Sequence, residues 1–147
     1  MIKLTSVVIR EFKIGDYQKV LKLWDNTGIH YRPKGRDSRQ RIGRELKSGQ
    51  GIFLVAEISG NIVGVVIGTN DGRKGWINRL AIAPEYQRQG IGRELVNKLE
   101  DHFSTLGINV IACLIERENT GSKKFFDHIG YLSGEVEYYS KRHSPDS

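Results

Sequence analysis

Two glycines, Gly90 and Gly92, mark the stretch of this sequence whose residue types could hold an anion. They follow a polar run from Glu85 to Gln89 and precede a long amphipathic run from Ile91 to Leu106. Glycine lets the backbone come close to a ligand, and the free N–H groups at a helix N-terminus favour phosphate oxygens. The spacing therefore predicts a phosphate site at the start of a helix.

The glycine pair alone leaves a second interpretation open. A dinucleotide-binding fingerprint requires a third glycine, and Leu95 stands at that position. Glycines at a strand-to-helix turn also allow close packing with no ligand. From these residues alone, a phosphate site and a packing turn are both consistent with the sequence.

The elements that would hold the glycine pair are predicted from apolar runs on either side of it. The residues from Trp76 to Ala83 predict a strand that Pro84 ends, because proline cannot donate to a sheet ladder. After the helix and Gly107, the run from Ile108 to Ile115 is almost continuously apolar, which is typical of a strand covered on both faces. A strand, helix and strand in this order predict a parallel crossover.

The rest of the chain is divided by glycine, proline and capping residues. Asp16 is expected to cap the first helix, and either Asp37 or Ser38 the second. Apolar and β-branched patterns predict three further strands over residues 6–12, 52–58 and 62–69, helices over 17–25, 38–47 and 120–129, and a last strand over 131–142. Turns over 59–61 and 70–75 predict that the strands over 52–58, 62–69 and 76–83 form an antiparallel meander.

Composition predicts one domain over residues 1–147, with 38% hydrophobic and 27% charged residues. No apolar run approaches the roughly 18 residues of a membrane span, and Met1 to Thr5 lack the apolar core of a signal peptide. Cys113 is the single cysteine, which fits a reducing compartment. We therefore expect a cytoplasmic protein with no membrane partner.

The net charge of +6 raises the question of a polyanionic partner. Basic residues are spread along the chain, with a modest cluster between Arg32 and Arg44. No aromatic residues interleave with that cluster in the way that binds single-stranded nucleic acid. Nucleic acid is therefore not expected as a partner.

Two motifs give the sequence a family resemblance. The residues from Gln87 to Gly92 match the Q/R-x-x-G-x-G/A signature of the GNAT superfamily of acyl-CoA-dependent N-acyltransferases. The residues on either side of this signature also resemble the superfamily. The segment from Asn119 to Tyr131 resembles the downstream motif of the same superfamily. The YpeA-like branch and the ribosomal-protein alanine acetyltransferases are the branches that the sequence is most similar to.

The resemblance implies an α/β GNAT fold, with a mixed, mostly antiparallel sheet of six to seven strands, helices on both faces and a splay between strands 4 and 5. It implies acetyl-CoA as the acyl-donor cosubstrate, its pyrophosphate held by backbone N–H groups and its pantetheine arm lying along the fourth strand. No metal is expected, and a homodimer is one assembly that the resemblance allows. The cofactor-binding residues that it implies are Leu80, Ala81, Ile82, Gln87, Arg88, Gln89, Gly90, Ile91, Gly92, Arg93, Asn119 and Phe126.

The resemblance fails at the residues that would move protons. Phe126 stands where many relatives have an acidic tyrosine, and Leu114 where the alanine acetyltransferases have a glutamate. The remaining candidates for a catalytic role are Glu116, Asn78 and Glu57.

The expected function is acetyl transfer to a primary amine, which could be a small molecule, a protein N-terminus or a lysine. The alternative is a non-catalytic acyl-CoA-binding or regulatory module.

Overall fold

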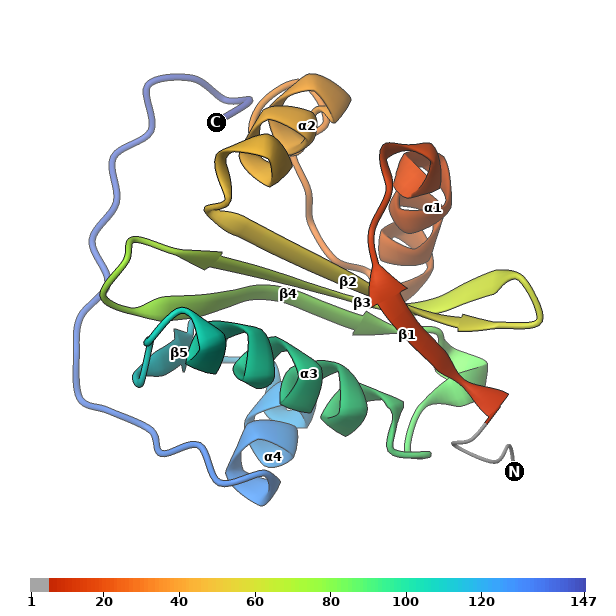
Figure 1. Ribbon diagram of the computed structural model, residues 1–147. Coiled ribbons are helices and arrows are strands. Elements are labelled where there is room, and N and C mark those ends of the chain that lie inside the picture. The colour runs from red at the N-terminus through yellow and green to blue at the C-terminus, as the bar shows by residue number, and fades with distance from the viewer. Residues whose placement is uncertain (1–5) are drawn as a thin grey trace.

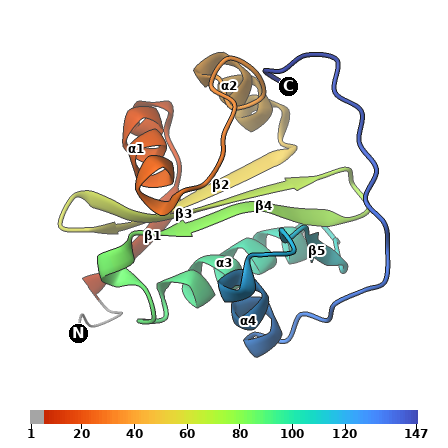
Figure 2. The same cartoon turned by 180° about the vertical axis from the view of Figure 1, so that it is seen from behind.

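The structure is a computed structural model that describes residues 6–147, so the predicted absence of a signal peptide at Met1 to Thr5 lies outside the described residues. A five-stranded sheet separates α1 and α2 on one face from α3 and α4 on the other (Figures 1 and 2). The elements are β1 (Val8–Glu11), the 3-10 turn η2 (Ile14–Asp16), α1 (Tyr17–Thr27), α2 (Arg39–Ser48), β2 (Gly51–Ile58), β3 (Asn61–Asn70), β4 (Gly75–Ile82), the 3-10 turn η3 (Pro84–Tyr86), α3 (Ile91–Thr105), β5 (Ile111–Cys113) and α4 (Thr120–His128).

The strands lie in the sheet in their chain order. The first four are antiparallel to their neighbours, and β2, β3 and β4 form the meander that their turns predict. The last pair is parallel, with Gly75 opposite Ile111 and Ile77 opposite Cys113. The predicted antiparallel meander and the parallel crossover through α3 are therefore both confirmed.

The prediction of six to seven strands is wrong for residues 6–147, which form a sheet of five. The predicted last strand, from Tyr131 to Arg142, is instead an extended segment that leaves α4 and passes outside the sheet to reach α2 (Figures 1 and 2). The strand predicted over residues 108–115 shortens to β5, because no neighbour pairs with its outer edge within the described chain. The prediction that both faces of this strand are covered is also wrong, since Val110 and Leu114 are exposed.

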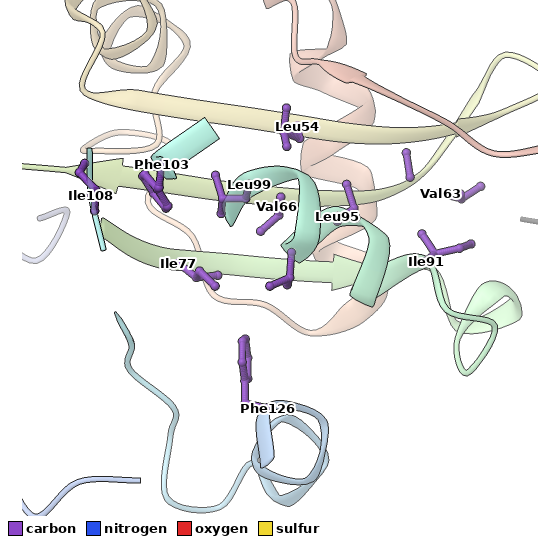
Figure 3. Close-up of a cluster of buried hydrophobic side chains, with 12 residues drawn as sticks. Leu54, Val63, Val66, Ile77, Ile91, Leu95, Leu99, Phe103, Ile108 and Phe126 are labelled. Carbon is purple, nitrogen blue, oxygen red and sulfur yellow. The ribbon is translucent and has the colours of Figure 1, made fainter. Parts of the chain in front are cut away.

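Two apolar clusters form the core, one on each face of the sheet. Neighbouring residues of a strand point to opposite faces, so Leu54 packs toward α3 and Val55 toward α1. The α3-side cluster is built around Leu95, Leu99 and Phe103, which lie on the buried stripe of α3 (Figure 3). The two clusters fix the sheet between its helices.

Two capping predictions are resolved by hydrogen bonds. The Oγ of Ser38 accepts the Arg41 N–H at 3.2 Å, so Ser38 caps α2. Asp16 makes no side-chain cap for α1, which corrects the prediction. Its carboxylate instead accepts the Lys13 N–H at 2.8 Å and pairs with Arg10.

Among residues 6–147, the structure contains no helix with the length and apolar character needed to span a membrane.

Candidate active site at the β4–β5 gap

A β-bulge interrupts β4 at Asn78. The register against β3 passes from Ile67 opposite Arg79 to Gly68 opposite Ile77, which leaves Asn78 without a partner in the β3–β4 register. An extra residue of this kind bends the strand and shifts the side-chain alternation by one position.

The bulge turns two consecutive polar side chains to the same face of the sheet. Asn78 Nδ2 donates to Thr69 Oγ1 at 2.7 Å, and Arg79 lies over the Trp24 ring on the α1 side. Ile77 and Leu80 both pack against the α3-side cluster, although a regular strand would place them on opposite faces. The bulge thus opens a polar position on the α1 face, midway along β4.

Just beyond the paired residues, β4 and β5 part. Their ladder ends with Ile77 opposite Cys113, whereas β4 continues to Ile82. The Ala83 N–H donates to Val63 O on the β3 side at 2.8 Å. Because alternate residues direct their backbone groups to opposite edges, Leu80 and Ile82 direct theirs to the gap. The gap therefore has one wall with strand-like donors and acceptors.

The N-terminus of α3 lies at the end of this wall. No side chain caps the helix at Gly90, and the Glu94 N–H donates to Gly90 O at 3.1 Å as the bond of the first turn. The N–H groups of residues 91–93 precede that bond and have no acceptor within the helix. Gly90 has φ 89° and Arg88 φ 60°, a left-handed conformation that is uncommon for arginine. Left-handed residues in a turn of this kind can gather backbone N–H groups into a concave anion site.

Gly92 packs closely against neighbouring elements, which is one of the two interpretations of the glycine pair. A Cβ at Gly92 would lie 3.2 Å from the Phe125 ring and 3.8 Å from Ile82. The first turn of α3 therefore contacts α4 and the end of β4 together. Phe125, which the sequence motif did not single out, forms a second wall beside the helix N-terminus.

The polar side chains of the signature mainly hold the loop in place. Gln87 Nε2 donates to Ile82 O at 3.0 Å, and Gln89 Nε2 to Glu85 O at 3.3 Å. Asn119 Oδ1 accepts the Ser122 N–H at 3.0 Å and caps α4. Arg88 and Arg93 are exposed and can reach a ligand at the helix N-terminus.

Phe126 lies in the core with its ring directed toward Ile77, where the β4–β5 ladder ends (Figure 3). It forms edge-on contacts with Phe125 and Tyr131, both with ring centroids 5.1 Å apart. The nearby Tyr131 hydroxyl donates to Glu100 Oε2 at 2.8 Å. Burial, followed by this hydrogen bond, raises the pKa of Tyr131, so its proton is held rather than offered.

The catalytic candidates from the sequence do not come together. Glu57 lies on β2, where its carboxylate accepts a hydrogen bond from Arg10 Nε at 2.7 Å. The strand β3 separates it from β4. Glu116 is an exposed residue of the loop after β5. Asn78 is the candidate that lies at the bulge.

A buried ion pair beside the bulge escaped the sequence analysis. Arg79 Nη2 donates to Asp37 Oδ2 at 2.8 Å, and that carboxylate also accepts the Arg32 N–H at 2.6 Å. Burial is the largest cause that lowers the pKa of Arg79, and the Asp37 charge opposes it. The available signal was an arginine directly before the apolar run Leu80-Ala81-Ile82 in a predicted strand, because a buried guanidinium needs a partner.

Glu45 adds an ionisable group to the same face. It lies on α2, half-buried, in a field shaped by Asp37 and Arg79. Burial first, and then the Asp37 charge, raise the pKa of the Glu45 carboxyl above its ordinary value. A carboxylate with a raised pKa is a better proton acceptor near neutral pH.

Comparison with known proteins agrees with this arrangement. The profile of the Acetyltransferase (GNAT) family matches residues 18–131. The PaiA N-acetyltransferase from Thermoplasma acidophilum, solved in complex with coenzyme A, has a similar fold at 20% identity and a TM-score of 0.80, covering 90% of this chain and 93% of that chain. The ribosomal-protein-alanine N-acetyltransferase from Brucella melitensis biovar Abortus 2308 is similar at 18% identity and a TM-score of 0.70, covering 92% and 98%. A profile that matches most of the chain, together with the open β4–β5 pair, shows that the chain belongs to the GNAT acetyltransferase family.

Proposed function

We propose that this protein is an acetyl-CoA-dependent N-acetyltransferase that transfers the acetyl group to a primary amine. The acceptor would be a small molecule, a protein N-terminus or a lysine side chain. The observation that carries the proposal is the end of the β4–β5 ladder at Ile77, while β4 runs on to Ile82 and the uncapped start of α3.

The start of α3 would hold the pyrophosphate. The free N–H groups of residues 91–93 and the positive end of the helix dipole favour phosphate oxygens. Ile91 is itself buried, so its contribution would be its backbone rather than its side chain. Arg88 and Arg93 would add charge from the solvent side.

The exposed edge of β4 would hold the pantetheine arm. Amide groups of the arm can pair with Leu80 and Ile82 in the manner of an added strand. Ala81 lies between them with its side chain buried in the α1-side cluster, so it would act through the course of the backbone. Phe125 and Gly92 would limit the width of the β4–β5 gap at the end that holds the pyrophosphate.

Acetyl-CoA, when bound, supplies a thioester carbonyl that the amine nitrogen attacks. A backbone N–H of β4 near the bulge can donate to the oxygen on which negative charge develops. The amine must lose a proton, and Glu45 on the α1 face is our candidate to accept it. Cleavage of the C–S bond releases CoA as a thiolate. A thiol such as that of cysteine has a pKa of about 8.5, so the thiolate can leave without an acid. Positioning then contributes several kcal/mol of the rate enhancement.

The burial of Phe126 favours one alternative function. Phe126 has no hydroxyl, and the Tyr131 hydroxyl is bound to Glu100, so neither ring offers a ready proton donor. A protein that binds acyl-CoA for regulation would need neither donor nor base. The alternative is therefore a non-catalytic acyl-CoA-binding module.

A thiol-release assay with acetyl-CoA over a panel of primary amines separates the two functions. The enzyme releases CoA thiol in an amine-dependent manner and yields an acetylated amine by mass spectrometry. The panel should contain polyamines, aminoglycosides, peptide N-termini and lysine peptides. Binding of CoA without thiol release from any of these would instead support the regulatory module.

A further inference from the structure

Positive charge is concentrated in residues 32–47, which comprise the loop before α2 and most of α2. This basic segment contains seven of the 23 lysines and arginines and two of the 17 acidic residues, so it carries a formal charge of +5 out of the chain's net +6. Basic residues also occur elsewhere, but there acidic residues balance them. The excess charge of the protein therefore belongs to this one segment.

The cations of the basic segment form no ion pairs within residues 6–147. The three ion pairs of this part of the chain use Arg10 and Arg79 as their cations. Of the two acidic residues in the segment, Asp37 is paired with Arg79, and Glu45 is half-buried. Charges of one sign that are held close together repel one another, and an anion from outside relieves this repulsion. The basic segment thus attracts anions.

Hydrogen bonds place the start of the basic segment beside the β4 bulge. The Arg32 N–H and the Arg79 guanidinium donate to the same Asp37 oxygen, at 2.6 and 2.8 Å. The Arg32 carbonyl accepts the N–H groups of Gly35 and Asp37, both at 3.0 Å, which folds the loop back on itself. Burial is the largest cause that lowers the pKa of Arg79, and the charges of Arg36 and Arg32 lower it further. Both cations therefore lie around Arg79, which directly follows the bulge.

The proposed proton acceptor, Glu45, lies on the same face of the sheet. A Cβ at Gly51 would lie 2.9 Å from Glu45 Cγ, so Glu45 covers the start of β2. Gly51 is opposite Thr69 on β3, and Asn78 Nδ2 donates to Thr69 Oγ1 at 2.7 Å. These three residues form a row across the face that α1 and α2 cover (Figures 1 and 2). An amine bound between Glu45 and the bulge would have the basic segment beside it.

We propose that the acceptor is a small primary amine that also carries an anionic group, a phosphate or a carboxylate, which Arg32 and Arg36 bind. This inference rests on the proposed acetyl transfer and names the chemical class of its acceptor. The planar guanidinium of arginine matches the oxygens of carboxylate and phosphate with two parallel hydrogen bonds. An acceptor with a second ammonium group would instead be repelled by the basic segment.

The remaining cations of the basic segment also favour the reactive form of the amine. Positive charge nearby disfavours the ammonium form, so it lowers the pKa of the bound amine. The neutral nitrogen then attacks the thioester carbon: the C–N bond forms, the C–S bond breaks, and the proton that the nitrogen loses passes to Glu45. The products are the thiolate of CoA and an amide that keeps its anionic group.

Four acceptors that share a 2-aminoethyl group test the proposal. O-phosphoethanolamine carries a phosphate, β-alanine a carboxylate, ethanolamine a neutral hydroxyl and 1,2-diaminoethane a second amine. Thiol release from acetyl-CoA gives kcat/KM for each acceptor. We expect kcat/KM to be about ten-fold higher for one of the anionic amines than for ethanolamine, and lowest for the diamine. The better of the two anionic amines identifies the anion. Its advantage should shrink as NaCl is raised from about 50 to 500 mM.

The double variant Arg32→Gln and Arg36→Gln removes the proposed contacts, and comparison with the unmodified protein cancels the intrinsic reactivity of each amine. The KM of the preferred anionic amine should rise by about ten-fold, while kcat/KM for ethanolamine stays within about two-fold. Lys98→Gln is the control, since it removes positive charge from an exposed position of α3, on the opposite face of the sheet. It should change neither value. An unchanged affinity for CoA by calorimetry verifies that each variant is folded.

The outcomes separate this proposal from the function on which it rests. Equal or faster acetylation of ethanolamine or the diamine would overturn the anionic acceptor and leave the acetyltransferase intact. An equal loss of turnover for all four amines in the double variant would also overturn it, because the arginines would then not act on the anion. CoA binding without thiol release from any amine would contradict the proposed function. Titration of the CoA complex with the two anionic amines then decides the anion site: heat that the double variant loses supports it, and no heat overturns it.

Discussion

The guanidinium of Arg79 donates to the buried carboxylate of Asp37 at 2.8 Å and lies over the Trp24 ring. The side chains of Arg79 and Asp37 are 12% and 5% exposed, respectively. The pair joins β4, one residue after the bulge, to the loop before α2. It thereby fixes the α1 face of the candidate site, on which Asn78 and Glu45 also lie.

Asp37→Asn should therefore destabilise the fold strongly. The substitution leaves the buried guanidinium of Arg79 without its counter-charge, which typically costs about 3–5 kcal/mol. Urea unfolding at neutral pH measures the change in the free energy of unfolding. Glu118→Gln, a carboxylate on the exposed loop before α4, is the control and should change it by less than about 0.5 kcal/mol. A loss below about 1 kcal/mol for Asp37→Asn would contradict this view of the pair.

Asp16 should make stability sensitive to acid. Its hydrogen bond with Arg10 is the largest cause that lowers its pKa below the ordinary value of 3.8. The folded protein therefore gains stability from Asp16 above that value and loses it as the pH falls further. Thermal unfolding between about pH 2 and 6 should show a shallower acid decline for Asp16→Asn than for the unmodified chain. Parallel acid limbs for the two proteins would show that Asp16 does not contribute.

Glu45→Gln should separate stability from activity. The pKa of Glu45 is raised in the fold, so its contribution to stability is fully present below the unfolded value and is lost as the pH rises. Removal of the charge should stabilise the fold at neutral pH. As the proposed proton acceptor, Glu45 should control the acidic limb of kcat/KM, and that limb should disappear in the variant. An unchanged pH profile would remove Glu45 from the mechanism.

Phe126→Tyr tests whether the missing proton donor limits turnover. The ring points toward Ile77 at the end of the β4–β5 ladder, so a hydroxyl on it would face the start of the gap. We expect kcat to rise by about ten-fold or more, because general acids accelerate such steps substantially. Burial of the hydroxyl should cost about 1–3 kcal/mol of stability. Tyr131→Phe is the control and should leave kcat unchanged, since its hydroxyl is bound to Glu100. A Phe126→Tyr variant with unchanged kcat would show that departure of the thiolate is not limiting.

Local patterns predict the helices, the meander and the glycine turn, because each depends on residues close together in sequence. Gly90 and Gly92 are examples, because a left-handed backbone at Gly90 and close packing at Gly92 each favour glycine at a single position. The Arg79–Asp37 pair joins residues 42 positions apart, so no local pattern reveals it. Asp16 was expected as a cap for α1, but Arg10 and the Lys13 N–H occupy its carboxylate.

The last strand illustrates the same limit. Residues 131–142 have the alternation of a strand, but a strand forms only where an edge accepts it. In the described chain the segment lies apart from β5 and pairs with no strand. Alternation predicts the propensity of a segment to form a strand, whereas strand pairing depends on whether the rest of the fold supplies a free edge beside it.

Calorimetric titration with CoA is the most direct test of the proposed site at the β4–β5 gap. The proposed site predicts one CoA per chain, with pantetheine alone binding much more weakly, because the start of α3 would hold the pyrophosphate. Gly92→Val should abolish the heat of binding, since its side chain would occupy the space beside Phe125 and Ile82. The absence of CoA binding by the unmodified chain at high micromolar concentration would contradict the account.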